Sequence, residues 1–157
     1  MKKITLMLMA FFTAITISYG QADYQTGIGV RGGLSNGITI KHFLGSQSAI
    51  EGIAAFRWGG YNLTGLYEIH TNAFDEPQLN FYYGAGGHIG FWDGDANPWF
   101  DDNQSYTVIG IDGILGLEYT FKEIPINLSL DWKPGFNLVG DSGFWGDEAA
   151  FSARFVF

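Results

Sequence analysis

The chain contains no cysteine, only 4 prolines, and few charged residues. The lack of cysteine excludes a disulfide framework, a thiolate metal site and a lipidated N-terminal cysteine. Charged residues make up 15% of the sequence, against roughly 25% in a typical soluble domain. Basic residues are the scarcer kind, 8 against 16 acidic ones. This excess of negative charge argues against nucleic-acid binding.

Long apolar runs are also absent, except near the N-terminus. There, two lysines precede an apolar stretch from residue 6 to residue 17, and the small residues Ser18 and Gly20 follow. This order is typical of a secretory signal peptide. The stretch is shorter than the roughly 20 residues that a membrane-spanning helix needs. A buried N-terminal helix is the alternative interpretation.

We therefore expect residues 1–20 to be a signal peptide and residues 21–157 to form one domain. Cleavage before Gln21 or before Asp23 fits the pattern. Removal of Lys2 and Lys3 leaves 6 basic residues against 16 acidic ones, a formal charge of −10.

What the chain has in abundance is glycine, with 23 residues, and aromatic side chains, at 17%. These residues lie in segments where apolar and polar positions alternate with a period of two, which predicts strands with two unlike faces. The predicted strands are 24–34, 37–44, 48–58, 60–72, 78–91, 106–121, 124–138 and 148–157. The boundary between the first two is open, because one strand over 27–43 is an alternative and would leave seven.

Three tight turns give an expected strand register. Gly59-Gly60 pairs Trp58 with Tyr61, Lys122-Glu123 pairs Phe121 with Ile124, and Ser35-Asn36-Gly37 pairs Leu34 with Ile38, with Gly37 left-handed. Short connections gather at one end of the strands, and two longer segments, from Trp92 and from Val139, lie at the other. This plan predicts an all-β fold, an eight-stranded antiparallel transmembrane up-and-down β-barrel.

Two arrangements of the faces are compatible with alternation: a soluble lipocalin-like barrel with an apolar interior, or a membrane barrel with a polar one. Apart from its charged residues, the polar face is built mostly of small residues, which suit a crowded interior. The apolar face carries no charge, as lipid requires. We therefore expect a membrane barrel whose balanced charges pair across a plugged lumen. The expected lumen network is Arg31, Lys41, Glu51, Arg57, Glu68, His70, His88, Asp112, Glu118, Asp131, Lys133 and Arg154.

The segments "GIDGILGLEYTFKEIPINLSLDWKP" and "AFSARFVF", with the signal peptide and the strand count, resemble small outer-membrane β-barrel proteins of the OmpX/OmpA-type class. The resemblance implies a porin-like scaffold in the outer membrane of a Gram-negative cell envelope. It also implies that the terminal aromatics Phe155 and Phe157 act as a signal for the outer-membrane assembly machinery. It does not determine the activity, because this fold serves several functions.

Catalytic and metal-binding patterns are weak. His42 lies near Ser46 and Ser48 in the sequence, but no acidic residue on the same face completes a triad. Asp93, Asp95 and Asn97 alternate as calcium ligands do, yet the central glycine and distal glutamate of an EF-hand are absent. We expect no catalytic residue, cofactor or metal. Aromatic residues in the long loops are candidate extracellular contacts: Trp99, Phe100, Phe144 and Trp145.

The sequence thus predicts a non-enzymatic, monomeric outer-membrane barrel that presents acidic and aromatic loops in a structural or interaction role. Its expected partners are outer-membrane lipid, the assembly machinery and an extracellular partner. A lipid-modifying enzyme and a narrow channel on the same scaffold are the alternatives.

Overall fold

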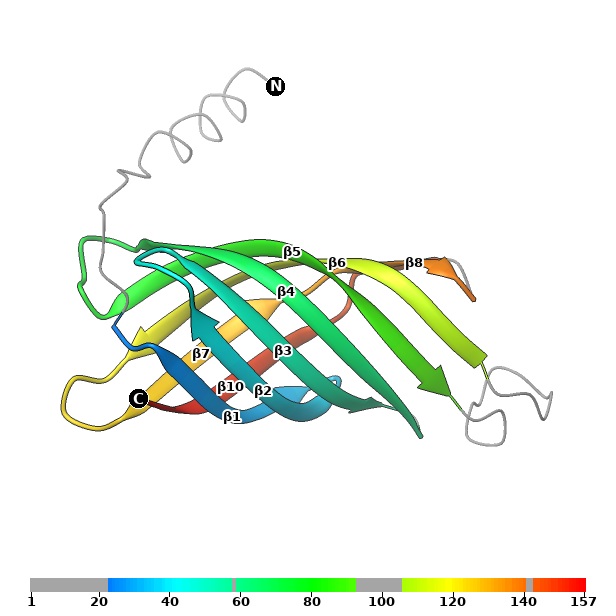
Figure 1. Cartoon of the computed structure of the whole chain (residues 1–157), viewed down its shortest axis with the longest axis horizontal. Coiled ribbons are helices and arrows are strands. Elements are labelled where there is room, and N and C mark those ends of the chain that lie inside the picture. Colours follow the sequence, from blue (N-terminus) through cyan, green and yellow to red (C-terminus); the bar gives the residue numbers. More distant parts are fainter. Residues whose placement is uncertain (1–22, 58, 93–105, 141–142) are drawn as a thin grey trace, which may run out of the picture.

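The computed structural model describes residues 23–57, 59–92, 106–140 and 143–157. The described chain is built of strands joined by turns (Figure 1). The strands are β1 (Thr26–Gly33), β2 (Asn36–Phe43), β3 (Ser48–Arg57), β4 (Gly60–Asn72), β5 (Leu79–Trp92), β6 (Tyr106–Thr120), β7 (Ile126–Trp132), β8 (Gly135–Val139), β9 (Gly143–Trp145) and β10 (Ala149–Val156). None of the described residues forms a helix long and apolar enough to cross a membrane.

The strands close into a barrel. Each strand from β1 to β6 pairs antiparallel with the next, and β10 returns to pair with β1 from Gly27↔Val156 to Gly33↔Ala150. β7 and β8 pair with β6 in turn and act as one strand. The wall therefore has eight strands, and the all-β, antiparallel fold expected from alternation is confirmed. β1 and β2 are separate strands, so the seven-stranded alternative is wrong.

One predicted strand, 124–138, is interrupted. Pro134 separates β7 from β8 because proline has no amide hydrogen for the ladder, although its carbonyl still accepts from the Gly113 amide at 2.8 Å. On the edge that faces away from β6, Trp132 of β7 pairs with Ala149 of β10, and Gly135 of β8 pairs with Trp145 of β9. The pairing thus shifts by one residue between β10 and β9, as at a β-bulge.

The register expected at all three turns is wrong. Phe56, not Trp58, pairs with Tyr61, because Gly60 already pairs with Arg57 and Gly59 takes the left-handed φ of 73°. Ile38 pairs with Val30 instead of Leu34. The left-handed glycines among the described residues are Gly59 and Gly140, so the expectation for Gly37 is also wrong.

The third turn is longer than two residues. The Phe121 amide donates to the Ile126 carbonyl at 3.0 Å, so Phe121 does not face Ile124. Pro125, which precedes Ile126, has no amide to donate. Each of the three shifts is an even number of residues, and an even shift keeps every side chain on its expected face.

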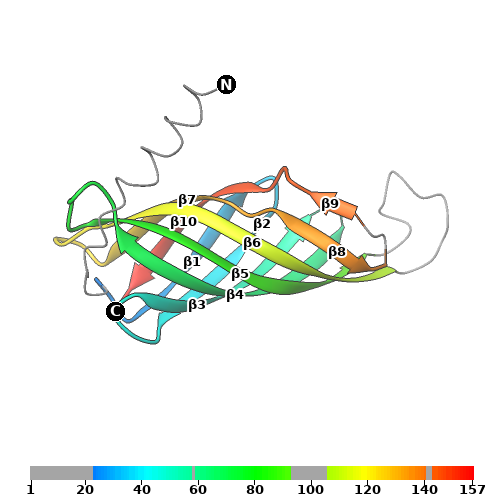
Figure 2. The ribbon, with the colours of Figure 1, turned by 90° about the horizontal axis from the view of Figure 1, so that it is seen from above.

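The barrel is apolar outside and polar inside. Among the described residues, thirty large apolar side chains are exposed, while the buried apolar set has twelve members, four of them alanines. Every Asp, Glu, Lys and Arg within a described strand lies on the face of its strand that points into the barrel. The strands run obliquely along the barrel (Figure 2). The short turns 44–47, 73–78 and 121–125 lie at one end with Phe157, here called the short-loop end; the opposite end is the long-loop end (Figure 1).

Candidate functional site in the barrel interior

The interior of the barrel gathers the charged residues singled out in the sequence. Eleven of the twelve are buried, with between 0% and 8% of their surface exposed. Arg57 is the twelfth; it lies at the long-loop end, and its side chain is 14% exposed. In a β-strand every second side chain points to the same face, so each strand of the barrel directs half of its side chains into the lumen. Charged residues from different strands therefore meet there.

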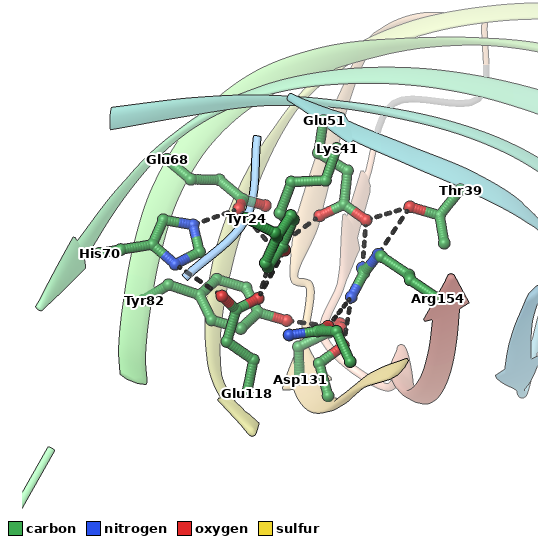
Figure 3. A network of polar contacts seen from close by, with 12 residues as sticks. Tyr24, Thr39, Lys41, Glu51, Glu68, His70, Tyr82, Glu118, Asp131 and Arg154 are labelled. Atoms are coloured by element: carbon green, nitrogen blue, oxygen red, sulfur yellow. Dashed lines mark hydrogen bonds and ion pairs between the residues drawn. The ribbon is translucent and has the colours of Figure 1, made fainter. Parts of the chain in front are cut away.

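The largest group is the central cluster, which consists of Lys41, Glu51, Glu68, His70, Glu118 and Arg154 (Figure 3). Lys41 Nζ lies 2.8 Å from Glu68, 3.3 Å from Glu118 and 3.4 Å from Glu51. Its ammonium also sits 3.9 Å from the centre of the Tyr82 ring, a cation–π distance. One lysine thereby joins carboxylates from β3, β4 and β6.

Arg154 and His70 complete the central cluster from opposite sides. The Arg154 guanidinium contacts Glu51 at 2.5 Å and donates to the Ser129 hydroxyl at 2.8 Å. Thr39 also donates its hydroxyl to Glu51. The His70 ring lies between two carboxylates, with Nε2 3.0 Å from Glu68 and Nδ1 3.3 Å from Glu118. It also stacks on Tyr82, with ring centres 5.0 Å apart.

A separate ion pair lies beside the central cluster. Arg31 donates to both carboxylate oxygens of Asp131, at 2.5 and 2.7 Å, with both side chains fully buried. Tyr82 donates its hydroxyl to the same carboxylate at 3.0 Å. A bidentate pair with a further hydroxyl donor offsets part of the high cost of burying two charges, although Arg31 Nε makes no hydrogen bond.

Nearer the long-loop end is the rim cluster, which consists of His88, Asp112, Lys133 and Glu148. Asp112 contacts His88 Nδ1 at 2.8 Å and Lys133 Nζ at 3.2 Å, and Lys133 reaches Glu148 at 3.1 Å. Beyond it, at the surface, Arg57 contacts Asp147 at 3.0 Å. The hydrogen bond from Arg57 holds the pKa of Asp147 below its ordinary value.

An apolar lid closes the short-loop end of the lumen. Tyr24 packs edge-on against Phe43, with ring centres 5.0 Å apart, and the two are buried with Ala49 and Val156. The Tyr24 hydroxyl points inward and donates to Glu118 at 3.4 Å. At the mouth, burial raises the pKa of Asp23, whose carboxylate accepts a hydrogen bond from Asn80.

Sequence reasoning left several members of the interior network out of the expected site. Glu148 is the first residue of the predicted strand 148–157 and shares the even parity of Arg154, so the same alternation applied to the whole strand would have found it. Tyr82 stands on the polar face beside His88, but nothing in its residue type indicates a charge partner. The other omitted members are Tyr24, Thr39, Asn127, Ser129 and Asn137.

The remaining expected site residues lie outside the lumen. Phe155 and Phe157 are exposed on the outer face, and Phe157 exchanges backbone hydrogen bonds with Thr26 at 2.8 and 2.9 Å. Phe144 and Trp145 are exposed at the long-loop end, 69% and 39% respectively. Trp99 and Phe100, the acidic segment from Asp93 and the predicted signal peptide lie outside the described residues.

His42 has a hydroxyl partner but no acid. Its Nδ1 lies 2.8 Å from the Thr26 hydroxyl on the outer face, and among the described residues Ser46 and Ser48 make no hydrogen bond to it. Within the same part of the chain, no group of three or more His, Asp or Glu residues is arranged to hold a metal ion. Comparison with known proteins found no matching family model, no matching curated protein and no matching solved structure.

Proposed function

We propose that this protein is an outer-membrane β-barrel whose lumen is closed by paired charges, and that it serves as a non-enzymatic scaffold presenting its long-loop end outward. The observation that carries this proposal is the inverted distribution of polarity. Apolar side chains cover the outside of the wall, and strand charges lie inside it. In water such a surface would expose far more contiguous apolar area than soluble monomers tolerate.

The hydrogen-bonded closure of the wall supports the membrane assignment. Lipid offers no partner to a free backbone amide or carbonyl, so a strand protein can cross a bilayer only as a closed barrel. Here β1 pairs with β10 and β5 with β6, so the wall closes on itself; among the described strands, the short β9 at the long-loop end is paired on one side only, with β8. Short turns at one end and longer connections at the other match the plan of outer-membrane barrels.

The filled lumen supports a scaffold role over a transport role. Lys41, Glu68 and Arg154 are completely buried at the level of the central cluster. An eight-stranded barrel has an interior just wide enough for its own side chains. The candidate loop contacts and an unidentified extracellular partner belong to this proposal, as do the assembly machinery and a monomeric state.

Two matched substitutions on the outer wall test whether lipid surrounds the barrel. Leu130, 61% exposed, lies in the middle of the β7–β8 strand, and Leu138, 56% exposed, lies near its long-loop tip. In a bilayer, Leu130→Arg should destabilise the fold by about 2–4 kcal/mol and Leu138→Arg by about 0–1 kcal/mol. Urea titrations of both variants in phospholipid vesicles measure the difference.

A soluble barrel gives a different result. Both leucines would then face water, and either arginine would change the free energy of unfolding by no more than about 0.5 kcal/mol. Heat-modifiable migration on a denaturing gel and recovery in the outer-membrane fraction are the accompanying expectations. Free solubility in detergent-free buffer, with no heat shift, would contradict the proposal.

A lipid-modifying enzyme is the second candidate, and the Thr26–His42 hydrogen bond is the observation in its favour. A hydroxyl beside an imidazole is the arrangement of an activated nucleophile, although the orienting acid is missing from the described contacts. Incubation of the purified protein with labelled lipid A, with and without His42→Ala, distinguishes the candidates. Turnover that depends on His42 would replace the scaffold proposal.

A further inference from the structure

The central cluster is one positive charge short. Its permanent cations are Lys41 and Arg154, and its carboxylates are Glu51, Glu68 and Glu118. The five side chains have 0% exposed surface. The adjacent Arg31–Asp131 pair is neutral by itself and supplies nothing. A net negative charge sealed away from water is costly, so the cluster requires one further proton.

The contacts around Glu68 show where that proton can bind. Glu68 Oε2 lies 3.0 Å from His70 Nε2, while His70 Nδ1 faces Glu118 at 3.3 Å. Ionised carboxylates only accept hydrogen bonds, and a neutral imidazole has one N–H to donate. Both contacts are satisfied only when one additional proton is present on the His70 ring or on a carboxyl beside it. Four buried atoms here form no hydrogen bond: Glu68 Oε1, Glu51 Oε2, Glu118 Oε1 and His70 Nδ1. Of these, Glu51 Oε2 lies 3.4 Å from the Lys41 ammonium, and His70 Nδ1 and Glu118 Oε1 face each other at 3.3 Å.

We propose that Glu68, with His70 on one side and Glu51 on the other, forms a binding site for a single proton that the closed lumen requires. This goes beyond the scaffold role and holds whether or not lipid surrounds the barrel. The groups that face the site come from β2, β5, β6 and the segment before β1: Lys41 and Phe43, Tyr82, Glu118, and Tyr24 through its hydrogen bond to Glu118. Arg154 adjoins it through Glu51.

The rim cluster does not impose the same requirement. His88 Nε2 faces the Asn137 side-chain amide at 3.0 Å, and an amide can offer either a donor or an acceptor. Glu148 is 15% exposed, so water also contacts this cluster. His88 is therefore the matched control for His70.

The sign of the pH effect follows from proton counting. Above about pH 7 an unfolded chain has released the protons of its carboxyl and imidazole groups. If the folded cluster still holds one proton, stability falls as the pH rises, and the unfolding constant increases by up to about tenfold per pH unit. The loss continues until the folded cluster releases the proton as well.

Glu68→Gln is the sharpest test, because the amide has nearly the same shape and removes one carboxylate. The cluster is then balanced at two cations and two anions without the extra proton. Urea unfolding in detergent micelles, followed by tryptophan fluorescence from pH 7 to pH 9, gives the slope of the unfolding constant for each protein. Wild type and His88→Gln should show the same steep slope. In Glu68→Gln the slope should be smaller by up to about a factor of ten in the unfolding constant per pH unit.

Glu118→Gln restores the same charge balance by a second route and serves if Glu68→Gln does not fold. A slope that either variant flattens supports the proton site. A wild-type slope no steeper than that of every one of these two variants that folds overturns it. So does a slope that His88→Gln flattens instead, since the proton would then bind in the rim cluster.

Discussion

Buried and exposed ion pairs in this barrel differ sharply in what their removal should cost. Asp131 holds Arg31 by two hydrogen bonds with both side chains sealed from solvent, whereas Asp147 meets Arg57 with 55% of its side chain exposed. Asp131→Ala leaves a guanidinium buried without its partner and should destabilise the fold by about 3–5 kcal/mol. Asp147→Ala should cost about 0–1 kcal/mol.

Urea midpoints of the two variants in one detergent check this difference. Because the loss in Asp131→Ala comes mainly from the stranded cation, the double variant with Arg31→Met should recover part of it. Equal losses for the exposed and buried pairs would show that the lumen is hydrated at the level of Asp131.

At the same scale, residue type and parity predict which side chains enter the lumen, but not how they pair there. The even or odd position of Lys41, Glu68 and Glu118 is enough to direct them inward. Their meeting at one ammonium depends on how far each strand is staggered around the barrel. Stagger is a property of the closed wall, so no local pattern in the sequence reveals it.

At the scale of the strand, glycines differ by where their missing side chains would point. A methyl group on Gly29 would overlap the carbonyl oxygen of Ala153 across the β1–β10 seam, while one on Gly65 would have nothing within 4 Å. Gly29→Ala should therefore destabilise the seam by about 1–3 kcal/mol, and Gly65→Ala should be neutral or slightly stabilising.

Thermal midpoints of the heat-modifiable band measure both glycine variants under one condition. Gly65→Ala controls for the change in chain entropy that any glycine replacement brings. If Gly29→Ala matched it, the close approach of the two strands at the seam would be wrong.

Strand existence and strand faces were predictable from alternation, and the inverted polarity was predictable from the small residues of the polar face and the lack of charge on the apolar face. The turn registers were not, and the reason is physical. Moving a pairing by two residues returns every side chain to the same face, so agreement of faces at Trp58 and Tyr61 could not distinguish that pairing from Phe56 with Tyr61. What decides between such registers is the backbone of the turn: the left-handed φ of Gly59 in one turn and the missing amide hydrogen of Pro125 in the other.

Across the whole molecule, two different barriers close the lumen in series. The apolar lid of Tyr24, Phe43, Ala49 and Val156 stands at the short-loop end, and the central cluster lies behind it. We therefore expect wild-type protein in a planar bilayer to show no stable large openings. Tyr24→Ala should also stay closed to ions, because the central cluster still fills the cross-section.

Conductance recordings of both proteins under the same voltage protocol check this expectation. Current through Tyr24→Ala alone would assign the closure to the lid. Stable large openings in the wild type would favour the narrow-channel alternative over a closed scaffold.

The pairing of β1 with β10 also sets the order of events during synthesis. Gly27 cannot find Val156 until nearly the whole domain has been made, so the wall is completed by its longest-range contacts. Until then, strand edges and alternating apolar residues remain open to other chains. A chain of this design stays vulnerable to such contacts until β10 pairs with β1, so its last strand is the part that ends the vulnerable period.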